Sequence, residues 1–259
     1  MAEFPPAGRV RAVDAPLAKA SAAAVRIAMW SGPRNISTAM MRAWGSRPGA
    51  HVVDEPFYAF YLHRTGLEHP GRDTILRSQP IDWRQVVRSL TGDPLPEGAN
   101  LLYQKHMTHH LLPEVDLSAL DGLRHAFLVR DPAEVLMSYT KVRGEPTLDD
   151  LGLPQQLALH ERFGGPVIDA RDVLERPAAT LRALCAALDV AFDEAMLRWD
   201  PGPRATDGVW GKHWYDGVWA STGFAAYRPP QEQVPDRLRP LLDRCLPYYD
   251  TMAAHRLVG

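Results

Sequence analysis

The residues best suited to chemistry lie in a short loop near the N-terminus. Residues 25–44 read VRIAMWSGPRNISTAMMRAW, an apolar run followed by a polar loop and a helical pattern that begins at Ser37 and Thr38. A strand that enters a helix in this way leaves unpaired backbone N–H groups at the positive end of the helix dipole, where anions bind. Arg34 adds a cation, and the two hydroxyls add donors. The loop therefore predicts an anion site, although a plain strand-to-helix turn with a satisfied N-cap is compatible with this segment alone.

A second strand–turn–helix pattern, FLVRDPAEVLMSY over residues 127–139, supports this interpretation. Arg130 follows an apolar run, and Ser138 lies about two helical turns further on. Ligands of open α/β sheets bind outside the carboxyl ends of the strands, and a guanidinium can hold a phosphate through two hydrogen bonds. The same arginine could instead form a surface salt bridge with Asp131.

The first loop does not fit a triphosphate-binding site. Such a loop reads GxxxxGK[ST], with the lysine on the phosphates and the last hydroxyl on Mg²⁺. Residues 32–38 read GPRNIST and lack both the second glycine and the lysine. Nor is there a convincing strand that ends in a magnesium-binding acid, because Arg130 precedes Asp131 at the end of the fourth predicted strand. An ATPase or kinase is therefore the weaker interpretation.

Apolar runs that alternate with helical patterns are the elements that must position these residues. We predict strands over residues 25–30, 51–54, 101–105, 125–129 and 167–169. We predict helices over residues 37–46, 56–64, 83–90, 132–142, 154–163, 177–188 and 235–256. The alternation is typical of a parallel sheet with helices on both faces, so we expect one three-layer α/β domain over residues 24–259. Residues 199–227 lack clear periodicity but are rich in tryptophan and glycine, and long irregular segments of this kind are often functional.

Taken together and in this order, the two motifs resemble those of the sulfotransferase family. The resemblance implies a P-loop-like topology and 3′-phosphoadenosine-5′-phosphosulfate as the sulfuryl donor, with no metal required. The family's first loop has the form PKSGTT and holds the 5′-phosphosulfate. Its second motif, an arginine and a serine eight positions apart, binds the 3′-phosphate. Arg130 and Ser138 match that spacing. The loop residues that the resemblance assigns to the donor are Gly32, Pro33, Arg34, Asn35, Ile36, Ser37 and Thr38.

Two departures from the family pattern have physical consequences. Arg34 stands where the family has a lysine, which keeps the charge but changes the geometry of its hydrogen bonds. Ile36 stands where the family has a glycine, so the backbone at Ile36 must avoid positive φ.

Two looser matches extend the resemblance over about residues 25–225. Residues 103–113 read YQKHMTHHLLP and are similar to the family's KTHLP…LLP segment, which implies that Lys105 contacts the transferred group or the bridging oxygen. Residues 211–224 occupy the place of the loop that covers the nucleotide, which implies that Lys212 lies near the 3′-phosphate. The tryptophans of this segment could equally be core anchors of a long loop.

Sulfuryl transfer to a hydroxyl or an amine requires a general base, and two residues are candidates. Glu55, in the sequence DEP, resembles the glutamate that some branches of the family carry after the second strand; an acid before proline is also common at helix starts. His106 follows Lys105, much as the family's catalytic histidine follows its lysine, and has the more suitable ordinary pKa. We favour Glu55 and keep His106 as the second candidate. The acceptor is expected to contact Phe57, Tyr58 and Tyr61.

Composition narrows the other possibilities. A net charge of −2 over 259 residues gives no reason to expect nucleic-acid binding, and no apolar run approaches the roughly 20 residues of a membrane span. The two cysteines, Cys185 and Cys245, are expected to be buried and reduced in a cytoplasmic protein.

We expect no metal site, because His106 and His110 fit a strand end and a helix start better than zinc ligands. Residues 1–23 are expected to form a loosely attached tail. Two alternative functions stay open: a P-loop kinase or nucleotide hydrolase, and a non-catalytic nucleotide-binding protein. The oligomeric state also stays open.

Overall fold

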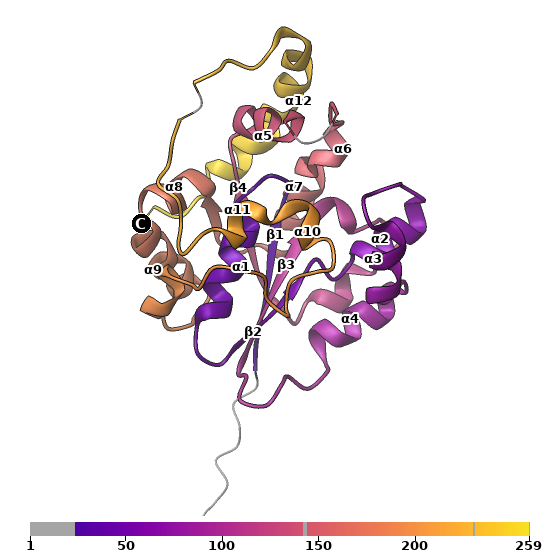
Figure 1. Ribbon diagram of the computed structural model, residues 1–259, viewed down its shortest axis with the longest axis vertical. Coiled ribbons are helices and arrows are strands. Elements are labelled where there is room, and N and C mark those ends of the chain that lie inside the picture. The colour runs from indigo at the N-terminus through magenta and orange to yellow at the C-terminus, as the bar shows by residue number, and fades with distance from the viewer. Residues whose placement is uncertain (1–23, 142–143, 230, 259) are drawn as a thin grey trace, which may run out of the picture.

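A five-stranded parallel sheet forms the centre of the computed structural model, which describes residues 24–141, 144–229 and 231–258 (Figure 1). The strand order is β2-β3-β1-β4-β5, and each neighbouring pair is parallel. The strands are β1 (Val25–Ser31), β2 (Ala50–Asp54), β3 (Leu101–Met107), β4 (Arg124–Val129) and β5 (Val167–Asp169). The predicted α/β class and parallel sheet are therefore confirmed. The tail predicted for residues 1–23 lies outside the described residues.

Helices cover both faces of this sheet, as a parallel sheet requires (Figure 1). Helices α1 to α6 are Ser37–Ser46, Tyr58–Thr65, Arg72–Ser78, Trp83–Thr91, Pro132–Thr140 and Leu148–Leu151. Helices α7 to α12 are Leu153–Phe163, Ala170–Glu175, Pro177–Ala187, Gly211–Trp214, Asp216–Trp219 and Arg239–Ala253. Four 3₁₀ turns are described as well: η1 (Thr108–His110), η2 (Leu117–Leu120), η3 (Glu194–Leu197) and η4 (Asp236–Leu238).

Alternating side chains of β1 explain the two layers of core. Ile27 and Met29 join a cluster with α1, α8 and α9, whereas Ala28 and Trp30 join a cluster with α4, α7 and α12. All four side chains are fully buried. Because successive residues of a strand point to opposite faces, a continuous apolar run is what a strand covered on both faces needs.

Helix boundaries test the sequence predictions more finely. The predicted helix over residues 37–46 is confirmed to the residue, as is the strand over residues 167–169. The helix predicted from residue 56 instead begins at Tyr58, because Glu55 has a positive φ of 40° and the chain turns there before the helix can start. The helix predicted over residues 235–256 is divided into η4 and α12.

Several short helices were not predicted from the sequence. They are α3, α6, α8, α10 and α11, and none is longer than seven residues. Residues 199–227, predicted to be irregular, contain α10, α11 and a single bridge between Arg198 and Gly223. Within the described residues, no helix has the length and apolar character needed to cross a membrane.

Candidate active site

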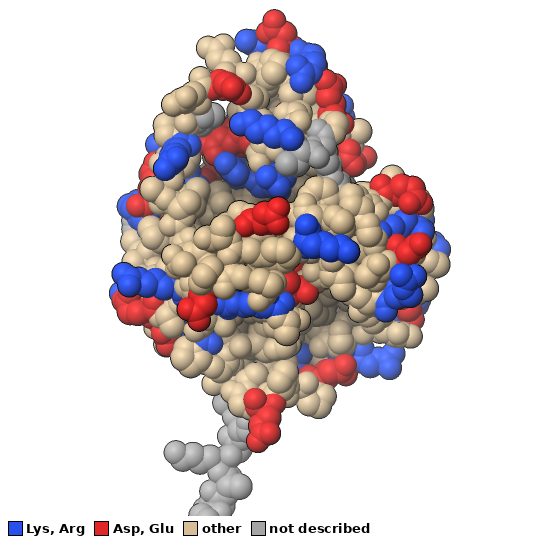
Figure 2. Space-filling view, viewed as in Figure 1, with Lys and Arg blue, Asp and Glu red and all other residues tan. Residues whose placement is uncertain are grey.

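A cavity of about 410 Å³ opens at the carboxyl ends of the central strands. Its walls include the loop after β1, the end of β2, Lys105 of β3, Arg130 after β4, and Ser138 of α5. Residues from 214 to 225 form another part of its wall. Figure 2 shows Lys and Arg side chains beside a recess on this face of the molecule, just above the position of α10 and α11 in Figure 1. The cavity is where ligands of open α/β sheets bind.

The loop after β1 forms the floor of a cradle. Pro33, Arg34, Asn35, Ile36, Ser37, Thr38 and Ala39 all line the cavity, which brings the first turn of α1 to its wall. Ile36 precedes the helix with φ −58°, as the absence of a glycine there requires. The positive φ falls on Arg34 instead, at 57°. A left-handed arginine is strained, and such strain persists only where surrounding contacts hold it.

Two side chains hold this loop against β4. Arg130 donates from Nη1 to the carbonyl oxygen of Arg34 at 2.8 Å. Asn35 donates from Nδ2 to the carbonyl oxygen of Leu128 at 2.8 Å. These two hydrogen bonds therefore hold the strained backbone of the loop against the neighbouring strand.

The structure brings the two predicted anion motifs together. Arg34 donates from Nε to the Ser138 hydroxyl at 3.0 Å, so a side chain of the first motif reaches the last residue of the second. Arg130 also donates to Glu134 at 3.0 Å, and Glu134 in turn accepts from the Tyr227 hydroxyl at 2.7 Å. Arg130 thus has a fixed orientation at the cavity wall, with a carboxylate as counter-ion.

Lys105 is the centre of a buried charge cluster. Its Nζ lies 2.9 Å from Asp54 Oδ1, 2.5 Å from Glu55 Oε1 and 2.8 Å from the Tyr215 hydroxyl. Burial acts against the charge of this side chain, but the carboxylates of Asp54 and Glu55 outweigh it and raise the pKa of Lys105 well above its ordinary value. Lys105 is therefore a permanent cation at the cavity, as its predicted role requires.

Glu55 lines the cavity beside this lysine. Its backbone N–H donates to the carbonyl oxygen of Lys105 at 2.8 Å, and Gln79 donates to the carbonyl oxygen of Glu55 at 3.2 Å. These contacts hold a non-glycine residue at positive φ, a conformation that is common where function requires a fixed side chain. The Glu55 Oε2 atom also lies 3.8 Å from His110 Nδ1.

The structure does not bring His106 to the cavity. Its ring lies on the opposite face of the sheet, stacked on Trp30 with ring centroids 4.2 Å apart and 3.1 Å from the Gln104 side-chain oxygen. Burial lowers the pKa of His106 to about 3. Lys105 faces the cavity, and its immediate neighbour must point the other way because strand side chains alternate. His106 is therefore badly placed for the role of base.

Two other predicted site residues also lie away from the cavity wall. Lys212 is exposed on α10 and does not line the cavity. Gly32 is buried behind the loop, where an added Cβ would lie 2.6 Å from the carbonyl oxygen of Leu151. Gly32 therefore permits close packing of the loop rather than direct contact with a ligand.

The aromatic residues of the irregular segment divide between two roles. Trp199 and Trp210 are buried in the core, whereas Trp214 and Tyr215 line the cavity. Of the residues expected to contact an acceptor, Tyr58 lines the cavity, while Phe57 is buried in the opposite cluster and Tyr61 packs on His110. Trp199 and Trp210 therefore fit the interpretation as core anchors of a long loop, and the expectation that this segment covers a nucleotide stays a prediction.

Several residues of the site were missed by the sequence predictions. His69, His109 and His110 line the cavity near Tyr58, whose hydroxyl lies 2.7 Å from His69 Nδ1. Asp54 and Tyr215, which lie 161 positions apart, share a hydrogen bond of 2.7 Å. The adjacent acids Asp54 and Glu55 were a visible signal, but no local pattern pairs Asp54 with Tyr215. In the described part of the chain, no group of three or more His, Cys, Asp or Glu is arranged to hold a metal ion.

Comparison with known proteins identifies the family. A family model described as "Sulfotransferase domain" matches residues 25–256. The chain belongs to this sulfotransferase family. The sulfotransferase domain of the Synechococcus PCC 7002 olefin synthase is similar in fold, with a TM-score of 0.50 and 17% identity over 88% of this chain and 96% of that one. A sulfotransferase from Alicyclobacillus acidocaldarius has a TM-score of 0.51 and 12% identity over 92% of this chain and 98% of that one.

Curated relatives carry other names. Branched-chain-amino-acid aminotransferase-like proteins 1 and 2 of Arabidopsis thaliana are 34% and 32% identical over 231 residues, which is 87% of this chain. The match spans 41% of the length of each of these relatives. This chain therefore spans less than half of the length of each of these relatives.

Proposed function

We propose that this sulfotransferase-family protein transfers a sulfuryl group from 3′-phosphoadenosine-5′-phosphosulfate to a hydroxyl or an amine of a small-molecule acceptor. One observation carries the proposal: the loop after β1, the Arg130–Ser138 pair and the Glu55–Lys105 pair all line one cavity. A donor with phosphate groups at both ends of its nucleoside requires two anion sites, and the acceptor requires a base near the transferred group.

The first anion site would hold the 5′-phosphosulfate. The amides of the first turn of α1, together with the hydroxyls of Ser37 and Thr38, supply donors at the positive end of the helix dipole. Arg34 and Lys105 supply positive charge where the bridging oxygen gains negative charge as its bond to sulfur breaks. The second anion site, Arg130 with Ser138, would hold the 3′-phosphate.

Glu55 would accept the proton of the acceptor. As the acceptor oxygen or nitrogen forms its bond to sulfur, the bond from sulfur to the phosphate oxygen breaks and adenosine 3′,5′-bisphosphate leaves. This assignment is supported by the position of Glu55, which lines the cavity beside Lys105, whereas His106 lies on the other face of the sheet. We therefore assign the base to Glu55 alone.

The wall beyond Glu55 would receive the acceptor. Tyr58, His69, His109 and His110 lie on this wall, and burial together with the neighbouring His109 lowers the pKa of His110 well below its ordinary value. His110 is therefore uncharged, and on this wall a small molecule would meet the ring of Tyr58 and the neutral imidazole of His110. The two cysteines are buried and unpaired, which favours a cytoplasmic setting for this reaction.

Calorimetric titration tests the proposed donor. Adenosine 3′,5′-bisphosphate is expected to bind, and ATP with Mg²⁺ is expected to bind at least about tenfold more weakly, since the loop lacks the lysine and second glycine of a triphosphate site. Tight binding of ATP with no binding of the bisphosphate would overturn the proposal in favour of a kinase or hydrolase.

A further inference from the structure

Two adjacent carboxylates at the end of β2 have different surroundings. Asp54 Oδ1 accepts from Lys105, and Asp54 Oδ2 accepts from the Tyr215 hydroxyl at 2.7 Å and from the backbone N–H of Gly208 at 2.9 Å. Both oxygens of Asp54 are thus engaged by protein donors, and the residue does not line the cavity. Asp54 is therefore not placed to touch a substrate, unlike Glu55.

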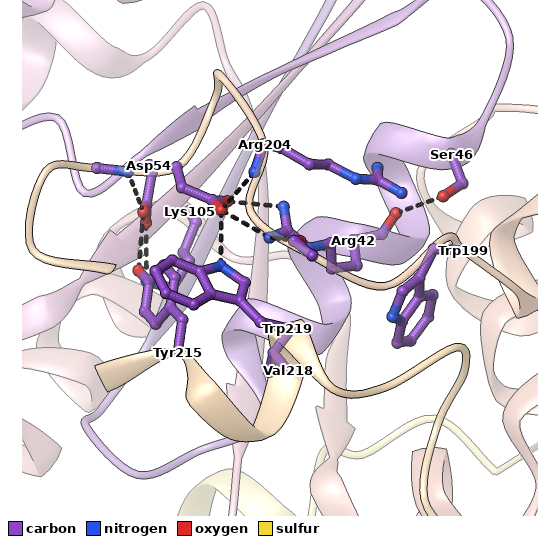
Figure 3. A network of polar contacts seen from close by, with 12 residues as sticks. Arg42, Ser46, Asp54, Lys105, Trp199, Arg204, Tyr215, Val218 and Trp219 are labelled. Atoms are coloured by element: carbon purple, nitrogen blue, oxygen red, sulfur yellow. Dashed lines mark hydrogen bonds and ion pairs between the residues drawn. The ribbon is translucent and has the colours of Figure 1, made fainter. Parts of the chain in front are cut away.

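Asp54, Lys105 and Tyr215 form a closed triangle of contacts. Lys105 lies 2.9 Å from the carboxylate and 2.8 Å from the phenol, and the phenol lies 2.7 Å from the carboxylate. Burial and the Asp54 carboxylate raise the pKa of Tyr215 well above its ordinary value, so its hydroxyl keeps the proton that it donates. Figure 3 shows the three side chains meeting, with Asp54 and Lys105 from the sheet and Tyr215 from the segment beside the cavity.

That segment, residues 199–227, is called the cover segment below. A second anchor holds it at Asp207, whose carboxylate accepts hydrogen bonds from Nη1 and Nη2 of Arg42 at 2.6 and 2.7 Å. Within the segment, Nε1 of Trp219 donates to the same carboxylate at 2.9 Å. Arg42 is a residue of α1 and is 1% exposed. Figure 3 shows this cluster to one side of the Asp54 triangle. Only a short stretch, which holds Gly208 and Trp210, connects the two anchors.

This stretch is tightly packed. A Cβ added at Gly208 would lie 2.1 Å from the ring of Trp210, and the indole Nε1 of Trp210 donates to the Tyr215 hydroxyl at 3.1 Å. Because these residues are tightly packed, a displacement at Asp207 would move Gly208, Trp210 and Tyr215 together. Loss of the Tyr215 contact would in turn remove one of the three groups that surround Lys105.

We propose that Asp54 is a positioning residue that couples the cover segment to Lys105, so that Lys105 is held most firmly while the cover segment is seated on the cavity. The proposal rests on the proposed function in one respect, that Lys105 serves the transferred group. Asp54 and Glu55 both lie within 2.9 Å of the lysine Nζ, and of these two carboxylates only Glu55 lines the cavity, where an acceptor can reach it.

Two measurements on the ligand-free protein test this coupling. Hydrogen exchange followed by mass spectrometry reports the opening of residues 208–219, and the rate of reductive methylation with formaldehyde reports the release of Lys105. The exposed Lys141 and Lys212 serve as internal references for methylation.

The decisive variant is Asp207→Asn, which alters the distant anchor and has no contact with Lys105. Both the exchange of residues 208–219 and the methylation of Lys105 are expected to rise by about tenfold or more, the equivalent of one lost hydrogen bond to a charged group.

Asp54→Asn and Tyr215→Phe are expected to raise the same two rates. Tyr249→Phe is the matched control, since it removes a similar tyrosine–aspartate hydrogen bond, of 2.8 Å to Asp169, that involves neither Lys105 nor residues 208–219. That control is expected to leave both rates at the wild-type value. If Asp207→Asn does not fold, Trp219→Phe removes a single hydrogen bond from the same anchor and serves in its place.

The proposal would be overturned if Asp207→Asn exchanged faster in the cover segment while the methylation rate of Lys105 stayed unchanged. It would also be overturned if the exchange and methylation rates of Asp54→Asn and Tyr215→Phe stayed at their wild-type values. Neither measurement needs a ligand, so a failed titration with adenosine 3′,5′-bisphosphate would reject the proposed donor and leave the coupling standing. Where that titration succeeds, saturating bisphosphate is expected to slow the methylation of Lys105 in Asp207→Asn.

Discussion

At the scale of single residues, position relative to the sheet decides which titratable groups can act. Lys105 and His106 are neighbours in β3, yet one lies at the cavity and the other is packed on Trp30. Glu55 and Asp54 are also neighbours, and only Glu55 lines the cavity. In each pair only one residue lines the cavity, and to that residue we assign a direct role in the proposed transfer.

The proposed role of Glu55 as base predicts a large kinetic effect of a small substitution. Glu55→Gln keeps the size of the side chain and removes its basicity, so turnover with the sulfuryl donor is expected to fall by more than about 10²-fold. The affinity for adenosine 3′,5′-bisphosphate, measured by calorimetry, is expected to stay within about threefold. Glu114→Gln, a change at an exposed ion pair with Arg64, is the control and should leave turnover unchanged. Near wild-type turnover of Glu55→Gln would reject Glu55 as the base.

Arg130 predicts a selective loss of affinity. Arg130→Ala is expected to weaken adenosine 3′,5′-bisphosphate by about 10- to 100-fold, because a hydrogen bond to a charged group contributes about 1.5–3 kcal/mol. Adenosine 5′-phosphate, which lacks the 3′-phosphate, should be weakened much less. Equal losses for the two ligands would show that Arg130 acts only by holding the backbone of Arg34, with which it shares a hydrogen bond. Arg162→Ala, at an exposed ion pair with Asp121, is the control.

At the scale of elements, the loop between β1 and α1 is held by its surroundings as much as by its own sequence. The helix begins where the hydroxyl residues Ser37 and Thr38 predict, but the left-handed turn falls on Arg34, which a local reading would not choose. The carbonyl oxygen of Arg34 is bound by Arg130 from another strand, and such a contact between distant segments can offset the strain.

Close packing of this loop predicts a stability effect at Gly32. Gly32→Ala would place a Cβ 2.6 Å from the Leu151 carbonyl oxygen, so the free energy of unfolding in urea is expected to fall by about 1–3 kcal/mol. Gly122→Ala is the matched control, since no atom lies within 4 Å of an added Cβ there, and it should change stability by less than about 0.5 kcal/mol. Similar stabilities of the two variants would mean that the loop moves away from Leu151 at little cost.

At the scale of the whole molecule, buried neutral histidines make stability depend on pH. His106 is buried with a pKa of about 3, against an ordinary value of 6.5. The unfolded chain therefore binds this proton between pH 6.5 and 3 while the folded protein does not. The contribution of neutral His106 to stability is thus present in full above pH 6.5 and is lost as the pH is lowered.

Urea titrations at several pH values measure this effect. Each buried histidine of this kind contributes a slope of up to about 1.4 kcal/mol per pH unit. His106→Gln removes one such proton, and its free energy of unfolding is expected to decline less steeply than that of the wild type between pH 6 and 4. Equal slopes for the two proteins would show that His106 becomes protonated in the folded state.

The sequence by itself determined the class of the fold and the position of the two anion motifs. Short apolar runs that alternate with helical patterns specify a parallel sheet, and the ends of its strands collect the residues that follow them. Arg34, Glu55, Arg130 and Ser138, identified from local pattern and spacing, meet at one cavity with Lys105, which was identified from the family resemblance.

Only the tertiary structure decided which face His106 takes, why Lys212 lies outside the cavity, and that Tyr215 reaches Asp54. Side-chain alternation places Lys105 and His106 on opposite faces, but the packing of helices on the sheet determines which face carries the cavity. A contact between residues far apart in the chain leaves no local periodic pattern, because it depends on how the segment of residues 199–227 packs against the sheet.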